Sequence, residues 1–311
     1  MLTLSLNGVI SFITPARAAA VLYATGVGTG PGAGLSALYT VDPLTGASSL
    51  VWNFPSIHIY AGGLAYDAAT DNLYATGVED SSTGTSRLFS INRFTGATTA
   101  FGGISSTINL SSGGLAINPL TGVMYATGTN GFQSHGLFTI DKNTGAATLV
   151  GQAGGECCVS PFGFNLNGLG FRGDGTLFAN GFTLSATQTE AAYSHLFTVN
   201  LTTGVATDIG SHGVTLGRLL AYSGLAFRDD GTLLSLGSIT GATGGLYSVN
   251  TATGAATLLG GTGLQFGVDG GLAFVPDSVS VPVPPTVWLF SLGLVGLIGV
   301  ARRKKAQAPV R

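Results

Sequence analysis

Two short motifs recur along this chain at intervals of about 50 residues, and this repetition constrains the fold more than any other feature. The first motif is LFTIDKNTGAATLV at Leu137, and its other copies begin at Leu38, Leu88, Leu196 and Leu246. The second is GGLAYDAATDNLYATG at Gly62, and its relatives begin at Gly113, Asn167 and Ser223. Repeats of this length, built from several short strands, are typical of β-propeller blades.

Each repeat unit predicts four β-strands, named A to D here. Strand A resembles GLAF, strand B LYATG, strand C LFTI and strand D ATLV, with the alternation expected of half-buried strands. The turn between C and D always reads Asp or Asn, two variable residues, Thr and Gly. Asp and Asn side chains hydrogen-bond the backbone of tight turns, and Gly adopts the positive φ that closes them. We therefore interpret these recurring acids as structural rather than catalytic or calcium-binding.

The two ends of the repeat array complete each other. VLYATG, from Val21, is a strand B that lacks its strand A, and GGLAFVPDS, from Gly270, is a strand A that lacks its successors. Joined, they form one blade beside four complete blades. The predicted fold is an all-β, five-bladed propeller of four-stranded blades over residues 21–280. Pairing of Gly270–Ser278 beside Val21–Gly26 is expected to close the ring and to remove open sheet edges.

Charge is sparse and unevenly distributed. Only 8% of the residues are charged, and 50 are Gly, which favours short strands and tight turns over helices. All 14 acidic residues lie in the predicted propeller, whereas Arg302, Arg303, Lys304, Lys305 and Arg311 lie in the C-terminal tail. The propeller is therefore mildly acidic, and we expect no nucleic-acid partner, because phosphate binding depends on Lys and Arg.

Connections on one face of the predicted ring vary in length and composition. A-to-B and C-to-D turns are nearly constant, whereas B-to-C and D-to-A connections differ, and the longest is Gly151–Gly168. In an up-and-down blade both variable sets lie on the same face, where repeat proteins carry their function. The candidate binding residues of this face are His58, His135, His195, His212, Glu156, Phe162, Phe164 and Tyr193. The alternative is that these residues simply occupy loops.

Two of these histidines invite a metal hypothesis. His135 and His195 both lie just before strand C of neighbouring blades, where two imidazoles could share an ion. A structural zinc site would need ligand pairs spaced two to four residues apart, and the sequence contains no such pairs. We therefore expect no metal and no cofactor.

Cys157 and Cys158 are adjacent, so they do not form a disulfide framework spread along the chain. Export would favour their oxidation to a vicinal disulfide, a small strained ring that stiffens the loop. The alternatives are two thiols or pairing between molecules.

Catalytic signatures were sought in the sequence. G-x-S-x-G, H-E-x-x-H, P-loop and C-x-x-C motifs do not occur, and no catalytic residue is assigned. The D-x-x-T-G turns resemble the repeat of pyrroloquinoline-quinone dehydrogenases, whose recurring Trp locks neighbouring blades. Here Trp52 alone could serve in that way, so this resemblance stops at the turn.

Residues 1–20 resemble a secretory signal peptide. An apolar stretch precedes A-R-A-A-A, which fits cleavage at Ala18 or Ala20. The usual basic residues before the apolar stretch do not occur, which suggests a natural start upstream of Met1. The alternative is a buried first strand.

The tail, residues 281–311, combines a Pro-rich spacer, an apolar run and the basic stop Arg302–Lys305. The uncharged run, residues 287–301, would span about 22 Å as a helix against roughly 30 Å of hydrocarbon. We predict a short single transmembrane helix that crosses the membrane transiently, with the basic stop on the cytoplasmic side.

This tail resembles the PEP-CTERM class of sorting signals, in its V-P-L-P-A variant. The matching residues are Val281, Pro282, Val283, Pro284 and Pro285, then the Trp288–Phe290 and Gly293–Ala301 segments, then Arg302, Arg303, Lys304 and Lys305. Val283 replaces the Glu of the commonest form, V-P-E-P. The resemblance implies a Gram-negative bacterium, Sec export, and handling by an exosortase-type enzyme at the inner membrane. It also implies association with exopolysaccharide or biofilm matrix. The remainder of the chain resembles the propeller-like repeat proteins that often precede such tails.

Two functions follow from these observations. The first is an exported protein, tethered to the inner membrane and then placed at the cell surface or outside the cell, whose propeller binds polysaccharide or protein. The second is a secreted lactonase- or lyase-like enzyme acting in the central channel. Histidines and carboxylates at the channel mouth would favour the enzyme, whereas a channel lined by Leu, Ala and Gly would favour the binding scaffold.

Overall fold

A computed structural model describes residues 20–27, 36–59, 62–79, 86–103, 108–110, 113–130, 135–153, 164–183, 194–213, 224–238, 244–264 and 270–276. Residues Val21–Val275 form one compact unit. The second unit comprises Met1–Ala20 and Pro276–Arg311, of which Ala20 and Pro276 are described.

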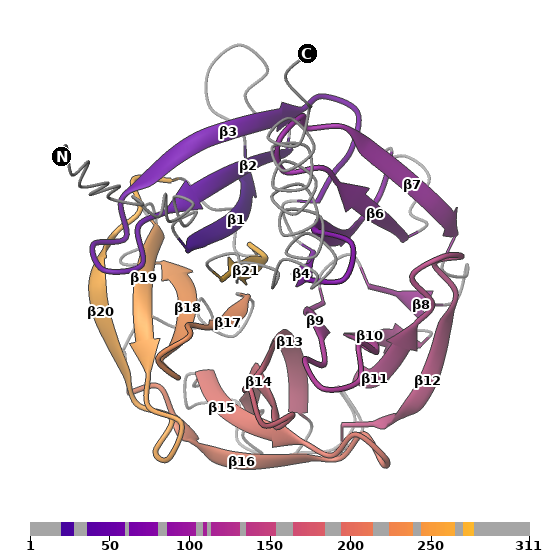
Figure 1. The fold of residues 1–311 in the computed structure, drawn as a ribbon. Helices are drawn as coiled ribbons and strands as arrows, with labels where there is room; N and C mark the ends of the chain where they lie inside the picture. The colour runs from indigo at the N-terminus through magenta and orange to yellow at the C-terminus, as the bar shows by residue number, and fades with distance from the viewer. Residues whose placement is uncertain are drawn as a thin grey trace, which may run out of the picture. The chain divides into compact units, whose positions relative to one another are not determined.

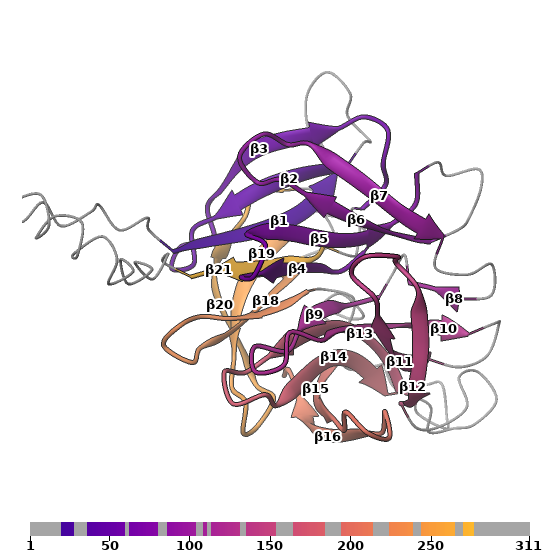
Figure 2. The same ribbon diagram turned by 45° about the vertical axis from the view of Figure 1, so that its right-hand side comes forward.

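Five antiparallel sheets surround a common centre, as Figures 1 and 2 show. Blade 1 contains β21 (Leu272–Val275), β1 (Val21–Val27), β2 (Ser36–Val41) and β3 (Ser48–Phe54). Blade 2 contains β4 (Leu64–Asp67), β5 (Asn72–Gly77), β6 (Arg87–Ile91) and β7 (Thr98–Gly103). Blade 3 contains β9 (Leu115–Ile117), β10 (Met124–Asn130), β11 (His135–Ile140) and β12 (Ala147–Gln152), with β8 (Ile108–Asn109) paired to β10.

The other two blades follow the same order from the centre outward. Blade 4 contains β13 (Phe164–Phe171), β14 (Leu177–Thr183), β15 (Ser194–Val199) and β16 (Ala206–Ser211). Blade 5 contains β17 (Leu225–Phe227), β18 (Leu233–Ser238), β19 (Gly244–Val249) and β20 (Ala256–Gly261). The five-bladed all-β architecture predicted from the repeats is therefore confirmed.

Closure of the ring by the two ends of the array is also confirmed. Strand β21 pairs antiparallel with β1, with Phe274 opposite Leu22 and Leu272 opposite Ala24. The Gly271 carbonyl accepts a hydrogen bond from the Thr25 amide at 3.0 Å, which extends the pairing by one residue. Blade 1 thus combines strands separated by most of the chain, and Figure 1 shows β21 lying beside β1 at the centre.

The predicted transmembrane helix requires correction. The part of the chain that the structure describes folds as strands and turns, and it contains no helix long and apolar enough to cross a membrane. The apolar run to which we assigned the helix, residues 287–301, lies outside the described residues. The apolar character that suggested a helix was interrupted by Gly293, Gly296 and Gly299, which disfavour helical structure.

Contacts between blades repeat around the ring. Each C-to-D turn ends in a Gly at positive φ, and this Gly packs on strand D of the preceding blade. The pairs are Gly46 on Gly260, Gly96 on Trp52, Gly145 on Gly102, Gly204 on Gly151 and Gly254 on Gly210. Trp52 therefore replaces a Gly in this series, and its indole Nε1 donates to the Arg93 carbonyl at 3.2 Å. The Trp that the sequence singled out does lock blade 1 to blade 2.

All five pairings between strands C and D contain a register shift at the same position. The shift leaves one apolar residue of each strand D unpaired. These residues are Val51, Phe101, Val150, Ile209 and Leu259, and each packs on buried residues of the hydrophobic core. A bulge increases strand twist, so the same device curves every blade and fills its core.

Candidate functional site

The centre of the ring is lined by strands β4, β9, β13, β17 and β21, each of which contacts the next. A-to-B and C-to-D turns lie on one side of the ring, called the turn face here. The strand ends that lead into the B-to-C and D-to-A connections lie on the other side, called the loop face; most residues of these connections lie outside the described part of the chain. The width of the central channel differs between the two faces: it is closed toward the loop face and open toward the turn face.

On the loop-face side, the channel is closed by glycine backbones. Gly63, Gly114, Gly168, Gly224 and Gly271 occupy equivalent positions, each directly before the Leu of a strand A. A Cβ built on Gly63 would lie 2.1 Å from the Leu115 amide nitrogen, and one built on Gly114 would lie 2.1 Å from the Asn167 carbonyl oxygen. The remaining cavity in this ring, called the glycine neck here, is about 10 Å³. A space of this size holds about one water molecule, so no larger ligand can pass.

Buried threonines hold the glycine neck in place. The Thr76 hydroxyl accepts the Gly63 amide at 2.9 Å, and the Thr127 hydroxyl accepts the Gly114 amide at 2.7 Å. Thr25 accepts the Gly271 amide in the same way, at 2.8 Å. Each Thr is fully buried, so its hydroxyl satisfies an amide that the sheet leaves unpaired.

On the turn-face side, the channel widens into a cavity of about 120 Å³, called the channel pocket here. Its lining comes from a run of three residues in every strand A, a Leu, a small residue and a third residue, together with Pro119. The third residues, called the rim here, are Tyr66, Ile117, Phe171, Phe227 and Phe274. Among the described residues that line the pocket, Tyr66 carries the one titratable side chain.

Two of the rim aromatics pack on the preceding blade. Phe171 lies against Tyr125 with ring centroids 5.6 Å apart, and Phe227 lies against Phe178 at 5.4 Å. Tilted aromatic contacts of this kind restrain ring orientation. The rim is therefore built from side chains that the blade interfaces hold in position.

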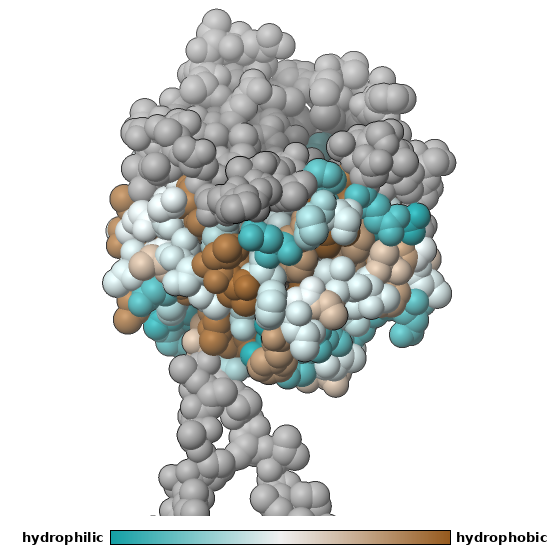
Figure 3. All heavy atoms as spheres, turned by 90° about the horizontal axis from the view of Figure 1, so that it is seen from above, coloured by the Kyte–Doolittle hydropathy of each residue, from teal (hydrophilic) through white to brown (hydrophobic). Residues whose placement is uncertain are grey.

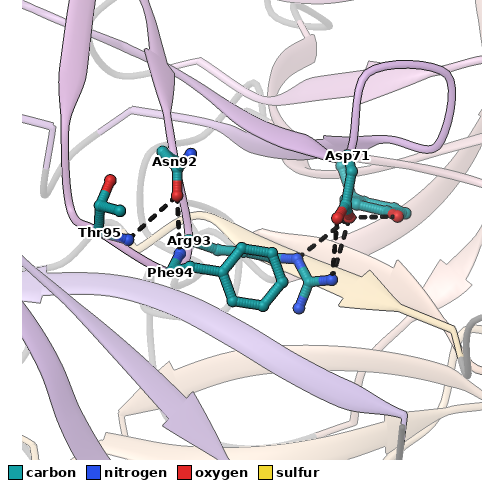
Figure 4. Close-up of polar contacts among 6 residues, drawn as sticks. Asp71, Asn92, Arg93, Phe94 and Thr95 are labelled. Atoms are coloured by element: carbon teal, nitrogen blue, oxygen red, sulfur yellow. Dashed lines mark hydrogen bonds and ion pairs between the residues drawn. The ribbon is translucent and has the colours of Figure 1, made fainter. Parts of the chain in front are cut away.

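Ion pairs surround the rim. The Arg93 guanidinium contacts both carboxylate oxygens of Asp71, which also accepts the Tyr66 hydroxyl at 2.9 Å. Figure 4 shows this guanidinium beside the ring of Phe94, whose centroid is 4.0 Å from Arg93 Cζ. Burial, reinforced by Asp71, raises the pKa of Tyr66 to about 12, so this phenol stays neutral.

Three further cations near the rim are also paired. Lys142 contacts Asp67 at 2.8 Å, and Arg228 contacts Asp230 at 2.9 Å. Arg172 hydrogen-bonds Asp174 and holds the pKa of that carboxyl well below its usual range. Each of these four cations has a carboxylate partner, and Asp229 beside Arg228 adds a fifth carboxylate, so these groups sum to a net charge of −1.

His58 and His195 lie apart from the channel. His58 forms an isolated bridge with Val78, with reciprocal backbone hydrogen bonds of 2.7 and 3.0 Å. His195 lies on β15, and its Nδ1 is 2.9 Å from both carboxylate oxygens of Asp208 on the outermost strand of blade 4. Neither residue lines the channel pocket or the glycine neck.

His135 anchors a connection between blades. It occupies the first position of strand C, where Ser36 accepts the Ile59 amide at 2.7 Å and Ser86 accepts the Leu110 amide at 3.0 Å. His135 instead donates a ring N–H to the Leu166 backbone, and its Nδ1 is buried without a hydrogen-bond partner among the described residues. Burial lowers the pKa of His135 to about 4. His195 occupies the second position of its strand, and successive strand residues point to opposite faces. The structure therefore does not bring these two imidazoles onto one metal.

His212 is buried between blades 4 and 5, with 1% of its surface exposed. Its Nδ1 lies 2.7 Å from the Gly254 carbonyl, and its Nε2 lies 3.0 Å from the Asn180 amide oxygen. Asn180 in turn donates to the Ser235 hydroxyl at 2.9 Å. Burial, and to a lesser extent the nearby His195, lowers the pKa of His212 to about 4. This residue joins two blades rather than facing solvent.

The remaining predicted residues lie outside the described part of the chain. They are Glu156, Phe162, Tyr193, Cys157, Cys158, Ala18 and all of residues 277–311. For Phe164 the backbone is described as the start of β13. Within the described ranges, no three His, Cys, Asp or Glu residues are arranged to hold a metal ion.

Sequence reasoning missed both the glycine neck and the rim. Their signal was present in the second motif, which reads Gly-Leu, a small residue, and then an aromatic or Ile in every copy. The motif by its spacing indicates the number of blades, and its side-chain directions become evident once strand A is placed at the centre. In a propeller, strand A is innermost, so this pattern lines the channel.

On the described surface, most of the exposed large apolar side chains lie on the turn face. Of the eight large apolar residues that are well exposed there, Leu44, Phe94, Leu120, Val123 and Val205 lie at turns of the turn face. The other three, Leu50, Leu149 and Leu258, lie on outermost strands. Figure 3 views the edge of the ring and shows hydrophobic and hydrophilic residues interspersed there.

Comparison with known proteins yields likeness in structure and none in sequence. No family model and no curated protein matches the chain. A putative 6-phosphogluconolactonase from Bacteroides fragilis is similar at 13% identity and a TM-score of 0.45, over 83% of this chain and 98% of that one. An endo-1,4-beta-xylanase from Bacteroides thetaiotaomicron is similar at 12% identity and a TM-score of 0.48, over 78% and 92%.

TolB from Acinetobacter baumannii is similar at 13% identity and a TM-score of 0.45, over 78% of this chain. The chain spans about half of the length of that protein, 52%. This similarity concerns the fold alone. The five sheets described above are what make this chain a propeller scaffold.

Proposed function

We propose that this protein is an exported propeller that binds polysaccharide or protein at the bacterial surface or in the extracellular matrix. The observation that supports the proposal is the architecture of the central channel. Leu, Ala and Gly line its inner part behind the rim of Tyr, Phe and Ile, and the glycine neck closes it toward the loop face. This is the lining that favours binding over catalysis.

The competing function is a secreted lactonase- or lyase-like enzyme that works in the channel. Such an enzyme needs a general acid or base within hydrogen-bond reach of its substrate. Tyr66 is the titratable group of the described pocket lining, and its raised pKa makes it a poor base near neutral pH. A binding site needs no such group, because apolar contacts and hydrogen bonds suffice.

Export and sorting belong to the same proposal. The signal-like residues 1–20 and the motif Val281–Pro285 support delivery through the Sec pathway and recognition by an exosortase-type enzyme. Replacing Val281–Pro285 with Gly and Ser should leave the protein in the envelope fraction of its host, whereas the wild type reaches the surface or medium. Equal distribution of both proteins would contradict the sorting role.

A glycan array probed with the purified protein, paired with a turnover assay on the glycans it retains, tests the binding function. We expect at least one neutral glycan to bind the protein and to remain unchanged after prolonged incubation. Conversion of a retained glycan would establish the enzyme instead.

A further inference from the structure

We propose that the channel pocket on the turn face binds one uncharged sugar ring at the end of a polysaccharide chain. This inference rests on the proposed binding function and adds the location and chemistry of the site. It also moves the site from the loop face, where the sequence suggested it, to the opposite face.

The first argument comes from the backbone of the lining strands. The Gly63 carbonyl accepts the Thr76 amide at 3.1 Å, which fixes the register of β4 against β5. In antiparallel pairs, alternate residues direct both backbone groups toward the neighbour, and the residues between them direct both groups away. Leu64 and Tyr66 therefore direct their N–H and C=O groups away from β5, and β4 is the innermost strand of its sheet. These groups face the channel pocket.

The same register holds in all five blades. In blades 3 and 1 the backbone amides of Thr127 and Thr25 donate to the carbonyls of Gly114 and Gly271, both at 3.0 Å, and these bonds fix the register. In blades 4 and 5 the backbone amides of Arg172 and Arg228 donate to the carbonyls of Thr176 and Thr232, both at 2.9 Å, and these bonds fix the same register. Backbone donors and acceptors thus converge on the pocket from every side. A ligand without hydroxyl groups would leave them unsatisfied, which is costly in a confined site.

The second argument comes from the side chains and charges. Tyr66, Ile117, Phe171, Phe227 and Phe274 surround the mouth with apolar surface. The C–H faces of a pyranose pack on such surface while its hydroxyl groups bond the backbone behind the rim. Arg93, Lys142, Arg172 and Arg228 each pair with a carboxylate, so none of these cations is left over to select an anion. With Asp229 the group carries a net charge of only −1, which is a weak attraction for a cation.

The third argument is size and closure. A cavity of about 150 Å³ accommodates one benzene ring, so the channel pocket at about 120 Å³ accommodates a single six-membered ring that remains partly in the mouth. The glycine neck prevents a chain from passing through. The pocket therefore recognises the end of a chain and not its middle.

The test uses saturation-transfer NMR with the full-length protein and the methyl pyranosides of glucose, galactose and mannose, with benzene as the apolar probe. We expect at least one pyranoside to bind with a millimolar Kd, as expected for a ligand of about a dozen heavy atoms. Ile117→Trp, which places a large ring in the mouth, should weaken binding at least tenfold. Aromatic side chains already occupy this position in the four other blades, so the variant should fold.

Two further variants serve as controls. Ile117→Phe completes the aromatic rim and should bind as well as the wild type or better. Leu258→Trp adds a comparable ring on the outermost strand of blade 5 and should change affinity less than twofold; thermal unfolding verifies that all three variants fold. Binding of benzene but of no pyranoside would overturn the sugar site. If the glycan array shows binding that Ile117→Trp leaves unchanged, the proposed function stands and the channel-pocket site is refuted.

Discussion

At the scale of single residues, glycine has two separate structural roles in this propeller. In the turns it supplies a positive φ, as Gly122 and Gly231 do with no neighbouring atom close to the place of a Cβ. In the neck it supplies the absence of a side chain, because the backbones of adjacent blades touch there. Glycine is therefore required for its backbone conformation in the turns and for its small size in the neck.

Substitution of a neck glycine should be severely destabilising. In Gly114→Ala, the new Cβ would lie 2.1 Å from the Asn167 carbonyl oxygen and 2.4 Å from the Leu169 amide nitrogen. We expect a loss of about 3 kcal/mol or more in the free energy of unfolding, measured by urea denaturation. The matched control is Gly173→Ala, where no atom lies within 4 Å, and its effect should stay within about 0.5 kcal/mol. Equal losses in the two variants would contradict close packing in the neck.

The two buried histidines should make stability depend on pH. His135 and His212 have pKa values lowered to about 4, whereas an imidazole in the unfolded chain titrates near 6.5. Between these values the unfolded state binds more protons, so stability is fully present above pH 6.5 and falls as the pH drops toward 4. Each His contributes roughly 3 kcal/mol to this loss. Denaturant unfolding at a series of pH values measures the slope.

His135→Ser provides the control for this pH dependence. Ser36, Ser86 and Ser194 occupy the same position in other blades, so the substitution fits the local structure. We expect the slope between pH 6.5 and pH 4 to fall by about half. An unchanged slope would show that His135 does not contribute.

At the scale of the structural element, the C-to-D turn both reverses the chain and joins two blades. Asp42 accepts the amides of Leu44 and Thr45 at 2.8 and 2.9 Å, and these bonds lower the pKa of its carboxyl. The Asn or Asp of the other four turns accepts the equivalent amides. The Gly that ends each turn then rests on strand D of the preceding blade. The recurring turn sequence therefore meets two requirements: it closes the turn, and it allows close contact with the preceding blade.

Two turn glycines separate these contributions. Gly254 and Gly231 both have positive φ, 78° and 83°, but a Cβ on Gly254 would lie 2.2 Å from the Gly210 carbonyl oxygen, whereas one on Gly231 meets nothing within 4 Å. Gly231→Ala should cost about 1 kcal/mol, the penalty of the left-handed conformation. Gly254→Ala should cost about 2 kcal/mol more because it also separates blades 4 and 5. Equal shifts in the urea midpoint would argue that the turn contributes to chain reversal alone.

At the scale of the whole molecule, stability depends on closure of the ring. Blade 1 takes β21 from one end of the array and β1 to β3 from the other, so each innermost strand has a neighbour on both sides. The Thr25–Gly271 contacts complete the glycine neck at the same place. Loss of β21 would open the neck, the channel pocket and the first sheet together.

Two truncations test this dependence. Removal of residues 281–311 should leave the cooperative thermal transition of the propeller unchanged, because the described strands end at Val275. Removal of residues 270–311, which also deletes β21, should abolish that transition and expose apolar surface to a hydrophobic dye. Unfolding of the shorter truncation would show that the tail contributes to the propeller.

Much of the fold was accessible from the sequence because the repeat is local and strong. Period, turn residues and the incomplete end units together predict blade number, strand order and closure. The candidate site was less accessible. His58, His135, His195 and His212 were grouped because they share a predicted face, yet His212 is buried and His135 and His195 point in different directions. The side of the strand on which a residue lies, and how deeply it is buried, depend on the bulges and on contacts with the neighbouring blade. The sequence of a single repeat does not contain this information.

The sequence by itself determined that this chain builds five similar blades and joins its ends, because hydrophobic alternation and turn chemistry act within each repeat. Only the tertiary structure decided which end of the channel is open. The glycine neck and the rim arise from the same short motif, five times over, and their properties appear when five backbones meet around one axis. Steric contact between residues about 50 positions apart is a property of the assembled ring, so it decides where a ligand can enter.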